Sequence, residues 1–99
     1  MHSFCWAKVK NMFYTYVLKL IDKSTDKVRY YIGYTSDLKQ RLNKHLTKSV
    51  NTTIESKKIE LIYYESCRNK TDAIHRERQL KTGFGRGYLK NRLKNDTRV

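Results

Sequence analysis

The sequence predicts an α/β fold in which a small, mostly antiparallel three-stranded sheet is flanked by helices, in the order β-β-α-β-α-α. A chain of 99 residues is long enough for one hydrophobic core only. Two β-rich runs lie on either side of a short polar segment, and a third run follows later in the chain. Leucines at regular spacing and helix-capping residues mark the intervening and following segments as helical.

The first two strands are predicted to form a hairpin. Residues 13–21 alternate between two faces that are both largely apolar, which is typical of a strand covered on both sides. Residues 22–27 are polar and rich in turn-forming side chains, and residues 28–34 form the second β-rich run. An antiparallel hairpin is the simplest connection between such runs. Residues 59–65 supply the third strand.

The first helix is expected over residues 36–48, where Ser36 and Asp37 provide a capping hydroxyl and an early negative charge. Arg41 and His45 lie four positions apart, so they should project together from this helix. They flank a stripe of leucines that should pack on the sheet, which consists of Leu38, Leu42 and Leu46.

The remaining segments complete one domain over residues 12–96, with residues 1–11 as an extension outside the fold. Asn69 begins a capping signal for the second helix, in which Glu77 lies beside the apolar stripe. Gly83 is expected to end that helix. The other expectations are a mobile loop over residues 49–58, a flexible turn over residues 83–87 and a last basic helix over residues 88–95.

Composition indicates a polyanionic partner. Lys and Arg number 22 against 9 Asp and Glu, which gives a formal net charge of +13. Nucleic acid is therefore the first partner to consider, and a ribosome-associated or membrane-surface protein is the alternative. Cys5 and Cys67 form no metal-type pair and are interpreted as free thiols. With neither an apolar span nor a signal peptide, the protein is expected to be cytoplasmic, nucleoid-associated and free of membrane contact.

Residues 31–45 form a strand-turn-helix joint with unusual chemistry. Tyr31 and Gly33 stand near the end of the second strand, Arg41 follows ten residues after Tyr31, and His45 comes one helical turn later. Arginine presents a planar, permanently charged fork that suits two phosphate oxygens. Histidine titrates near neutrality and could donate to phosphate or shuttle a proton. The joint therefore predicts a phosphate-binding face.

At these residues the chain resembles the GIY-YIG nucleases. Tyr31-Ile32-Gly33 is similar to the second half of the family motif. Tyr14-Thr15-Tyr16 on the preceding strand is similar to the first half, with Tyr14 in place of the glycine. Arg41 and Glu77 follow at suitable spacings, and the resemblance covers roughly residues 13–90. Asn91 is the nearest candidate for a late Asn that several of these nucleases carry.

The resemblance implies roles for individual residues. Tyr16 would be the general base, Tyr31 would orient the water or the phosphate, and Glu77 would hold a single Mg²⁺ or Mn²⁺ ion. The expected catalytic residues are Tyr16, Tyr31, Arg41, His45 and Glu77. The expected substrate-binding residues are Gly33, Arg41, Lys44 and Arg86, with Gly33 letting the phosphate approach the backbone.

Structural interpretations of the same residues stay open. Tyr16 and Tyr31 also fit ordinary strand aromatics, and Gly33 fits an ordinary strand-ending glycine. Glu77 also fits an i,i+4 ion pair with Lys81 on the helix surface.

The predicted function is a metal-dependent endonuclease that hydrolyses phosphodiester bonds in DNA, with branched or damaged DNA in repair or recombination as candidate substrates. In most related enzymes a separate domain or subunit selects the target, so a targeting protein partner is one expectation. The oligomeric state is left open. The alternatives are a non-catalytic basic nucleic-acid-binding module and, third, a basic protein-interaction domain.

Overall fold

The computed structural model describes residues 11–47 and 55–96 and contains the predicted three-stranded antiparallel sheet. β1 (Phe13–Asp22) lies between β2 (Val28–Thr35) and β3 (Ser56–Cys67) and pairs with both in antiparallel fashion. The predicted hairpin of the first two strands is therefore confirmed.

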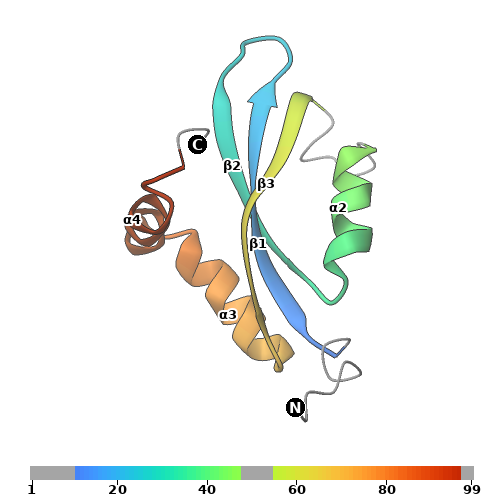
Figure 1. Cartoon of the computed structure of the whole chain (residues 1–99), viewed down its shortest axis with the longest axis vertical. Coiled ribbons are helices and arrows are strands. Elements are labelled where there is room, and N and C mark those ends of the chain that lie inside the picture. The colour runs from blue at the N-terminus through green and yellow to red at the C-terminus, as the bar shows by residue number, and fades with distance from the viewer. Residues whose placement is uncertain (1–10, 48–54, 97–99) are drawn as a thin grey trace.

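The helices cover both faces of this sheet. α2 (Leu38–Leu46) lies on one face, whereas α3 (Lys70–Leu80) and α4 (Gly83–Arg92) lie on the other (Figure 1). The element order β-β-α-β-α-α and the α/β fold class are confirmed. Among the residues that the structure describes, no helix is long and apolar enough to cross a membrane.

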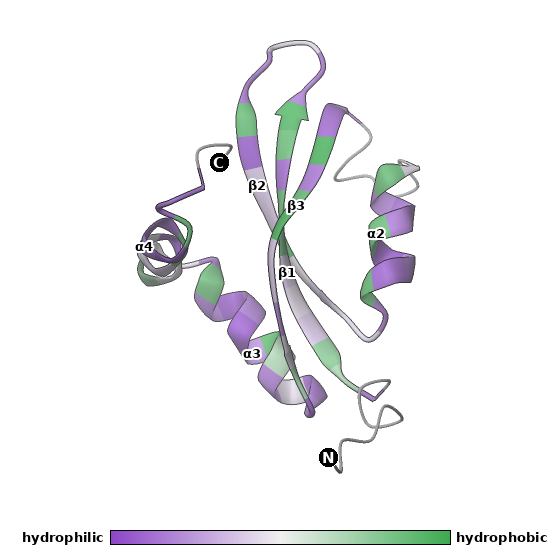
Figure 2. Ribbon diagram, in the orientation of Figure 1, coloured by the Kyte–Doolittle hydropathy of each residue, from purple (hydrophilic) through white to green (hydrophobic). Residues whose placement is uncertain are grey.

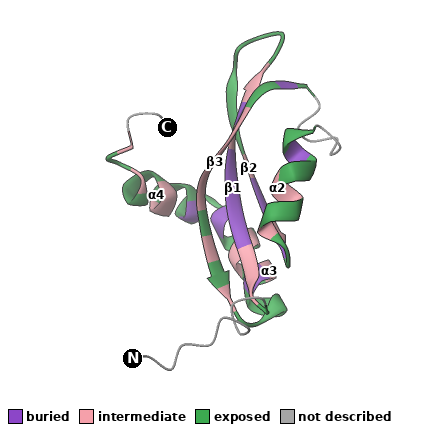
Figure 3. Ribbon diagram, turned by 45° about the vertical axis from the view of Figure 1, so that its right-hand side comes forward, coloured by how far each residue is buried: buried purple, intermediate pink, exposed green. Residues whose placement is uncertain are grey.

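β1 carries most of the core because it is the central strand. Successive side chains of a strand point to opposite faces, so an unbroken apolar run is buried only when both faces are covered. Tyr16 and Leu18 pack on the α2 side, while Val17 packs with Leu80 on the α3 side. Figure 3 shows the buried residues concentrated along β1. The predicted two-sided burial of this strand is confirmed.

α2 begins where the sequence indicates, but its last turn differs from the prediction. Asp37 caps the helix by accepting a hydrogen bond of 3.0 Å from the backbone N–H of Gln40. Figure 2 shows hydrophobic positions on the side of α2 that faces the sheet. The prediction that Leu46 packs on the sheet is wrong, because its side chain is 51% exposed. The helix ends at Leu46, and the fully buried His45 takes the sheet-facing position of the last turn.

β3 begins earlier than predicted. Ser56 pairs with Asp22 and Lys58 pairs with Ile21, so residues 56–58 belong to the sheet and not to a mobile loop. Backbone pairing with β1 extends the strand through these polar residues, which no apolar pattern marks. Residues 49–54 of the predicted loop and residues 1–10 of the predicted extension lie outside the described residues. Cys67 is a free thiol, as predicted.

The glycine-rich segment is helical, so the predicted flexible turn over residues 83–87 is wrong. Thr82 caps α4 by accepting a hydrogen bond of 3.2 Å from Gly85 N, and the helix begins at Gly83. A Cβ atom on Gly85 would collide with the backbone of Gln79 and Leu80. Glycine therefore lets α4 start directly against the end of α3, which removes the need for a longer connection. The helix ends at Arg92.

A polar network ties β3 to the two helices on its face. Arg76 of α3 donates from Nε and Nη2 to the Glu65 carboxylate at 2.7 and 3.1 Å. Its guanidinium also lies 4.6 Å from the centroid of the Tyr88 ring of α4. The Tyr63 hydroxyl donates to Glu65 at 2.7 Å. These contacts connect α3 and α4 to β3 through charge-assisted hydrogen bonds and a cation–π contact.

Candidate active site

Three ring side chains that the sequence predicts to be catalytic meet where α2 packs on the hairpin. Tyr16 Oη and His45 Nε2 are 2.9 Å apart, within hydrogen-bonding distance. The ring centroid of Tyr31 lies 5.2 Å from that of His45 and 6.1 Å from that of Tyr16. Tyr16 is 1% exposed and His45 is completely buried. The structure therefore brings Tyr16, Tyr31 and His45 into one cluster.

The strand register explains why the two tyrosines share this cluster. Tyr16 of β1 pairs with Gly33 of β2, and Leu18 pairs with Tyr31, so the tyrosines are diagonal neighbours on one face. A Cβ atom on Gly33 would lie 2.7 Å from Tyr16 Oη and 3.0 Å from Tyr31 Cε2. Gly33 therefore supplies the space in which both rings are seated, a packing role that the motif does not reveal.

Burial sets the protonation states of the hydrogen-bonded pair. Burial, followed by the charge effect of the neighbouring Tyr31, raises the pKa of Tyr16 well above its ordinary value of 10.0, so this phenol is protonated at neutral pH. Burial also lowers the pKa of His45 below 6.5, and the positive charge of Arg41 lowers it further. His45 is therefore a neutral imidazole at neutral pH, and its Nε2 can accept the phenol proton.

Arg41 and Glu77 bring opposite charges to this cluster from two different layers. Arg41 of α2 lowers the pKa of Tyr16, whereas the more weakly acting Glu77 of α3 raises it. Glu77 has a side chain that is 17% exposed and forms an i,i+4 ion pair of 3.3 Å with Lys81 Nζ. The ion pair expected from the structural interpretation of Glu77 is thus present, and the carboxylate also acts on the Tyr16 phenol.

The donor set fits a metal ion that is held by one carboxylate. In the described part of the chain, no three His, Cys, Asp or Glu side chains gather as a metal cage. Mg²⁺ commonly uses one or two carboxylates, keeps several waters and takes further ligands from phosphate. Glu77 can provide such a carboxylate once the Lys81 ammonium moves away from it.

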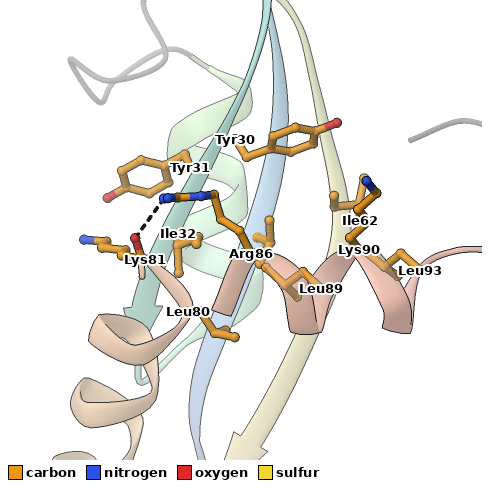
Figure 4. A pocket seen from close by; sticks show the side chains of 11 residues that line it. Tyr30, Tyr31, Ile32, Ile62, Leu80, Lys81, Arg86, Leu89, Lys90 and Leu93 are labelled. Carbon is orange, nitrogen blue, oxygen red and sulfur yellow. Dashed lines mark hydrogen bonds between the residues drawn. The ribbon is translucent and has the colours of Figure 1, made fainter. Parts of the chain in front are cut away.

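Two of the predicted substrate-binding residues, Lys44 and Arg86, are cations on helices that cover opposite faces of the sheet. Lys44 is exposed on α2, directly before His45, and Arg86 is exposed on α4. Arg86 Nη1 donates to the backbone carbonyl of Lys81 at 3.3 Å. Arg86 also lines a cavity of about 630 Å³, and Tyr31 lines the same cavity (Figure 4). Arg86 thus shares a cavity with one tyrosine of the cluster.

Two residues that line this cavity were not predicted from the sequence. Tyr30 and Lys90 line it together with Arg86 and Tyr31. Tyr30 belongs to no motif, and Lys90 is one of many basic residues in the chain. Tyr30 and Tyr31 are adjacent in β2, so they place one aromatic ring on each face of the sheet. This pair of tyrosines is the signal that could have indicated Tyr30.

Comparisons with known proteins identify the family of this chain. The GIY-YIG catalytic domain family matches residues 12–93. A "UPF0213 protein" of Bacillus pumilus (strain SAFR-032) is 38% identical over 74 residues, which cover 74% of this chain and 70% of the relative. The "UPF0213 protein in ldhD 5'region" of Pediococcus acidilactici is 35% identical over 74 residues, covering 72% of this chain and 70% of the relative. No solved structure matches the chain. The chain therefore belongs to the GIY-YIG family, whose catalytic domain supports nuclease activity in general.

Proposed function

We propose that this protein is a divalent-metal-dependent endonuclease that hydrolyses phosphodiester bonds in DNA. The observation that carries the proposal is the buried hydrogen bond of 2.9 Å between Tyr16 and His45, with Tyr31 beside it. Arg41 and Glu77 add one cation and one carboxylate within electrostatic reach of the Tyr16 phenol. A general base, a phosphate-binding cation and a metal-binding carboxylate are the groups that phosphodiester hydrolysis requires.

In the proposed step, Tyr16 Oη removes a proton from water while it passes its own proton to Nε2 of His45. The transfer needs a neutral imidazole, and the lowered pKa of His45 provides one at neutral pH. The resulting hydroxide attacks phosphorus, the bond to the leaving oxygen breaks, and that oxygen takes a proton from solvent. His45 returns its proton through Tyr16 to solvent before the next cycle.

Arg41 binds the phosphate and stabilises the charge that grows on its oxygens. Its planar fork can donate to two of these oxygens, which a lysine at the same position could not do in the same geometry. Glu77 would hold Mg²⁺ or Mn²⁺, which when bound supplies positive charge to the phosphate and lowers the pKa of coordinated water. Tyr31 would orient the water or the phosphate beside Tyr16.

Tyr16→Phe tests the proton transfer most directly. This change removes the hydroxyl that lies 2.9 Å from His45 but keeps the buried ring, so the fold should be retained. We expect the single-turnover cleavage rate to fall by at least about 100-fold on labelled linear, nicked or branched DNA with Mg²⁺ or Mn²⁺. Tyr64→Phe, on an exposed ring, is the matched control. Cleavage by Tyr16→Phe at the rate of the unmodified protein would contradict the mechanism.

Variants of Arg41 and Glu77 should distinguish effects on DNA binding from effects on cleavage. Arg41→Ala should weaken both DNA affinity and cleavage, because phosphate is contacted before and during the reaction. Glu77→Gln should abolish most cleavage but leave metal-free DNA affinity equal or slightly higher. Glu60→Gln, which alters an ion pair on β3, is the control for charge alone. If Glu77→Gln cleaves at a nearly unchanged rate, Glu77 is not the metal ligand.

We further propose branched or damaged DNA as the substrate, with target choice aided by a protein partner, and a cytoplasmic, nucleoid-associated location where such DNA occurs. Comparing nicked, branched and linear duplexes in the cleavage assay tests the substrate. Salt-sensitive binding without scission in any metal would instead identify a non-catalytic nucleic-acid-binding module.

A further inference from the structure

The cavity between β2 and α4 is distinct from the buried Tyr16–His45 pair, but it reaches the cluster through Tyr31. It encloses about 630 Å³, which is within the range of sites that bind small organic groups. Its walls are mostly apolar and come from the sheet and both C-terminal helices, namely Val17, Ile32, Ile62, Leu80, Leu89 and Leu93. Such walls suit a flat, weakly polar ring better than a phosphate group.

The rim of the cavity is cationic. Lys81, Arg86 and Lys90 lie around it, and none of the described residues that line it is acidic. In Figure 4 the Arg86 guanidinium lies between Tyr31 and the carbonyl of Lys81. An occupant that combines an apolar ring with negative charge on its flanks therefore complements the cavity.

Aromatic surface at the mouth adds a stacking platform. Tyr30 is 49% exposed and lies on the rim, so its ring is accessible without any rearrangement of the fold. Aromatic side chains beside basic ones are the usual combination for holding single-stranded nucleic acid. A base in an intact duplex is stacked on both sides and cannot enter such a cavity.

We propose that this cavity is a subsite for one unpaired nucleobase of the DNA, next to the phosphate that Tyr31 and Arg41 would engage. The base would lie between the ring of Tyr30 and the leucines of α4, and its flanking phosphates would contact Arg86 and Lys90. This inference rests on the proposed function and narrows its substrate class to DNA with an unpaired nucleotide at the cleavage position.

The test measures binding without metal, so that it is independent of cleavage. A DNA hairpin with one bulged 2-aminopurine nucleotide is titrated with the protein in EDTA, beside the same hairpin with an abasic bulge and a fully paired hairpin. We expect quenching of the 2-aminopurine fluorescence on binding. We also expect the abasic and paired hairpins to bind more weakly by about 5- to 150-fold, the usual effect of losing one stacked base.

Two variants address the cavity itself. Tyr30→Ala removes the stacking ring, and Leu93→Trp fills the cavity without changing charge. Both should lose at least about fivefold in affinity for the bulged hairpin and keep their affinity for the paired one. Tyr64→Ala removes a ring that is 53% exposed but does not line this cavity, and it should change neither affinity.

Three outcomes would overturn the subsite. The first is equal affinity of the protein for the bulged and abasic hairpins, and the second is an equal loss of affinity of the two variants for the bulged and paired hairpins. The third is a dimer in sedimentation that Leu93→Trp dissociates. The last outcome would make the cavity a contact between two copies of the chain. A preference for the bulged base without cleavage in Mg²⁺ or Mn²⁺ would support the subsite but refute the nuclease. Cleavage without such a preference would support the nuclease but refute the subsite.

Discussion

Gly33→Ala should damage both the stability and the activity of this protein, although it adds a single methyl group. The new Cβ atom would lie 2.7 Å from Tyr16 Oη, 2.8 Å from Tyr16 Cζ and 3.0 Å from Tyr31 Cε2. The backbone of Gly33 does not have a positive φ, so the effect is steric and not conformational. Tyr16 is 1% exposed and its hydroxyl is engaged by His45, so its ring has little room to retreat.

The size of the effect follows from this overpacking. An extra methyl group in a well-packed core typically costs about 1–3 kcal/mol of unfolding free energy. For a domain of this size each kcal/mol lowers Tm by about 4–8 °C. A shift of about 1 Å at a reacting group can cost about 100-fold in rate, so cleavage should fall by about that factor. Thermal unfolding and single-turnover cleavage at a temperature where the variant is folded measure the two effects separately.

Gly87→Ala is the matched control, because a Cβ atom at Gly87 meets nothing within 4 Å. Alanine in this exposed helical position should leave stability unchanged or raise it by about 0.5–1 kcal/mol. Adding Tyr16→Phe to Gly33→Ala removes the shortest of the new contacts, so the two changes should be less destabilising together than their sum. A Gly33→Ala protein with unchanged Tm and unchanged cleavage would refute the seating of the two rings over Gly33.

Three further predictions concern the packing around the site. His45 has a pKa below that of an unfolded histidine, so the unfolded chain binds more protons in acid, and the unfolding free energy should fall as pH drops through about 6.5. Urea unfolding at pH 7.5 and 5.5 should show a smaller pH difference for His45→Gln than for the exposed His75→Gln, and equal differences would be contrary to this expectation. Gly85→Ala should lower the unfolding free energy by more than about 3 kcal/mol, because the new Cβ would meet the backbone at the end of α3 and not a flexible side chain. A soluble Gly85→Ala variant with an unchanged melting curve by circular dichroism would contradict this prediction. Arg76→Ala should cost about 1–2 kcal/mol in urea unfolding through loss of its paired bonds to Glu65, and additivity with Glu65→Gln in a double-mutant cycle would show that the pair is not coupled.

Local patterns in the sequence are sufficient for most of the architecture. The apolar character of both faces of residues 13–21 predicts a strand that is covered on both sides. A polar turn between two adjacent β-rich runs predicts the hairpin, and the cap at Asn69 predicts the start of α3, where its side chain accepts from Thr71 N at 2.8 Å. The spacing of Tyr16, Tyr31, Arg41 and Glu77 identifies the family, because the motif depends on order along the chain.

The tertiary structure decides which partner each of these residues has. His45 lies beside a leucine stripe in the sequence, whereas the packing of α2 on the sheet buries it completely against Tyr16. Glycines 83, 85 and 87 resemble a loop locally, but close contact with the end of α3 favours a helix, because a side chain at Gly85 would not fit. Local propensity cannot include that contact, which involves atoms of a different element. The cavity at Tyr31 is likewise formed by β2 and α4, which are distant in sequence, so its rim of Tyr30, Arg86 and Lys90 exists only once the helices have packed on the sheet.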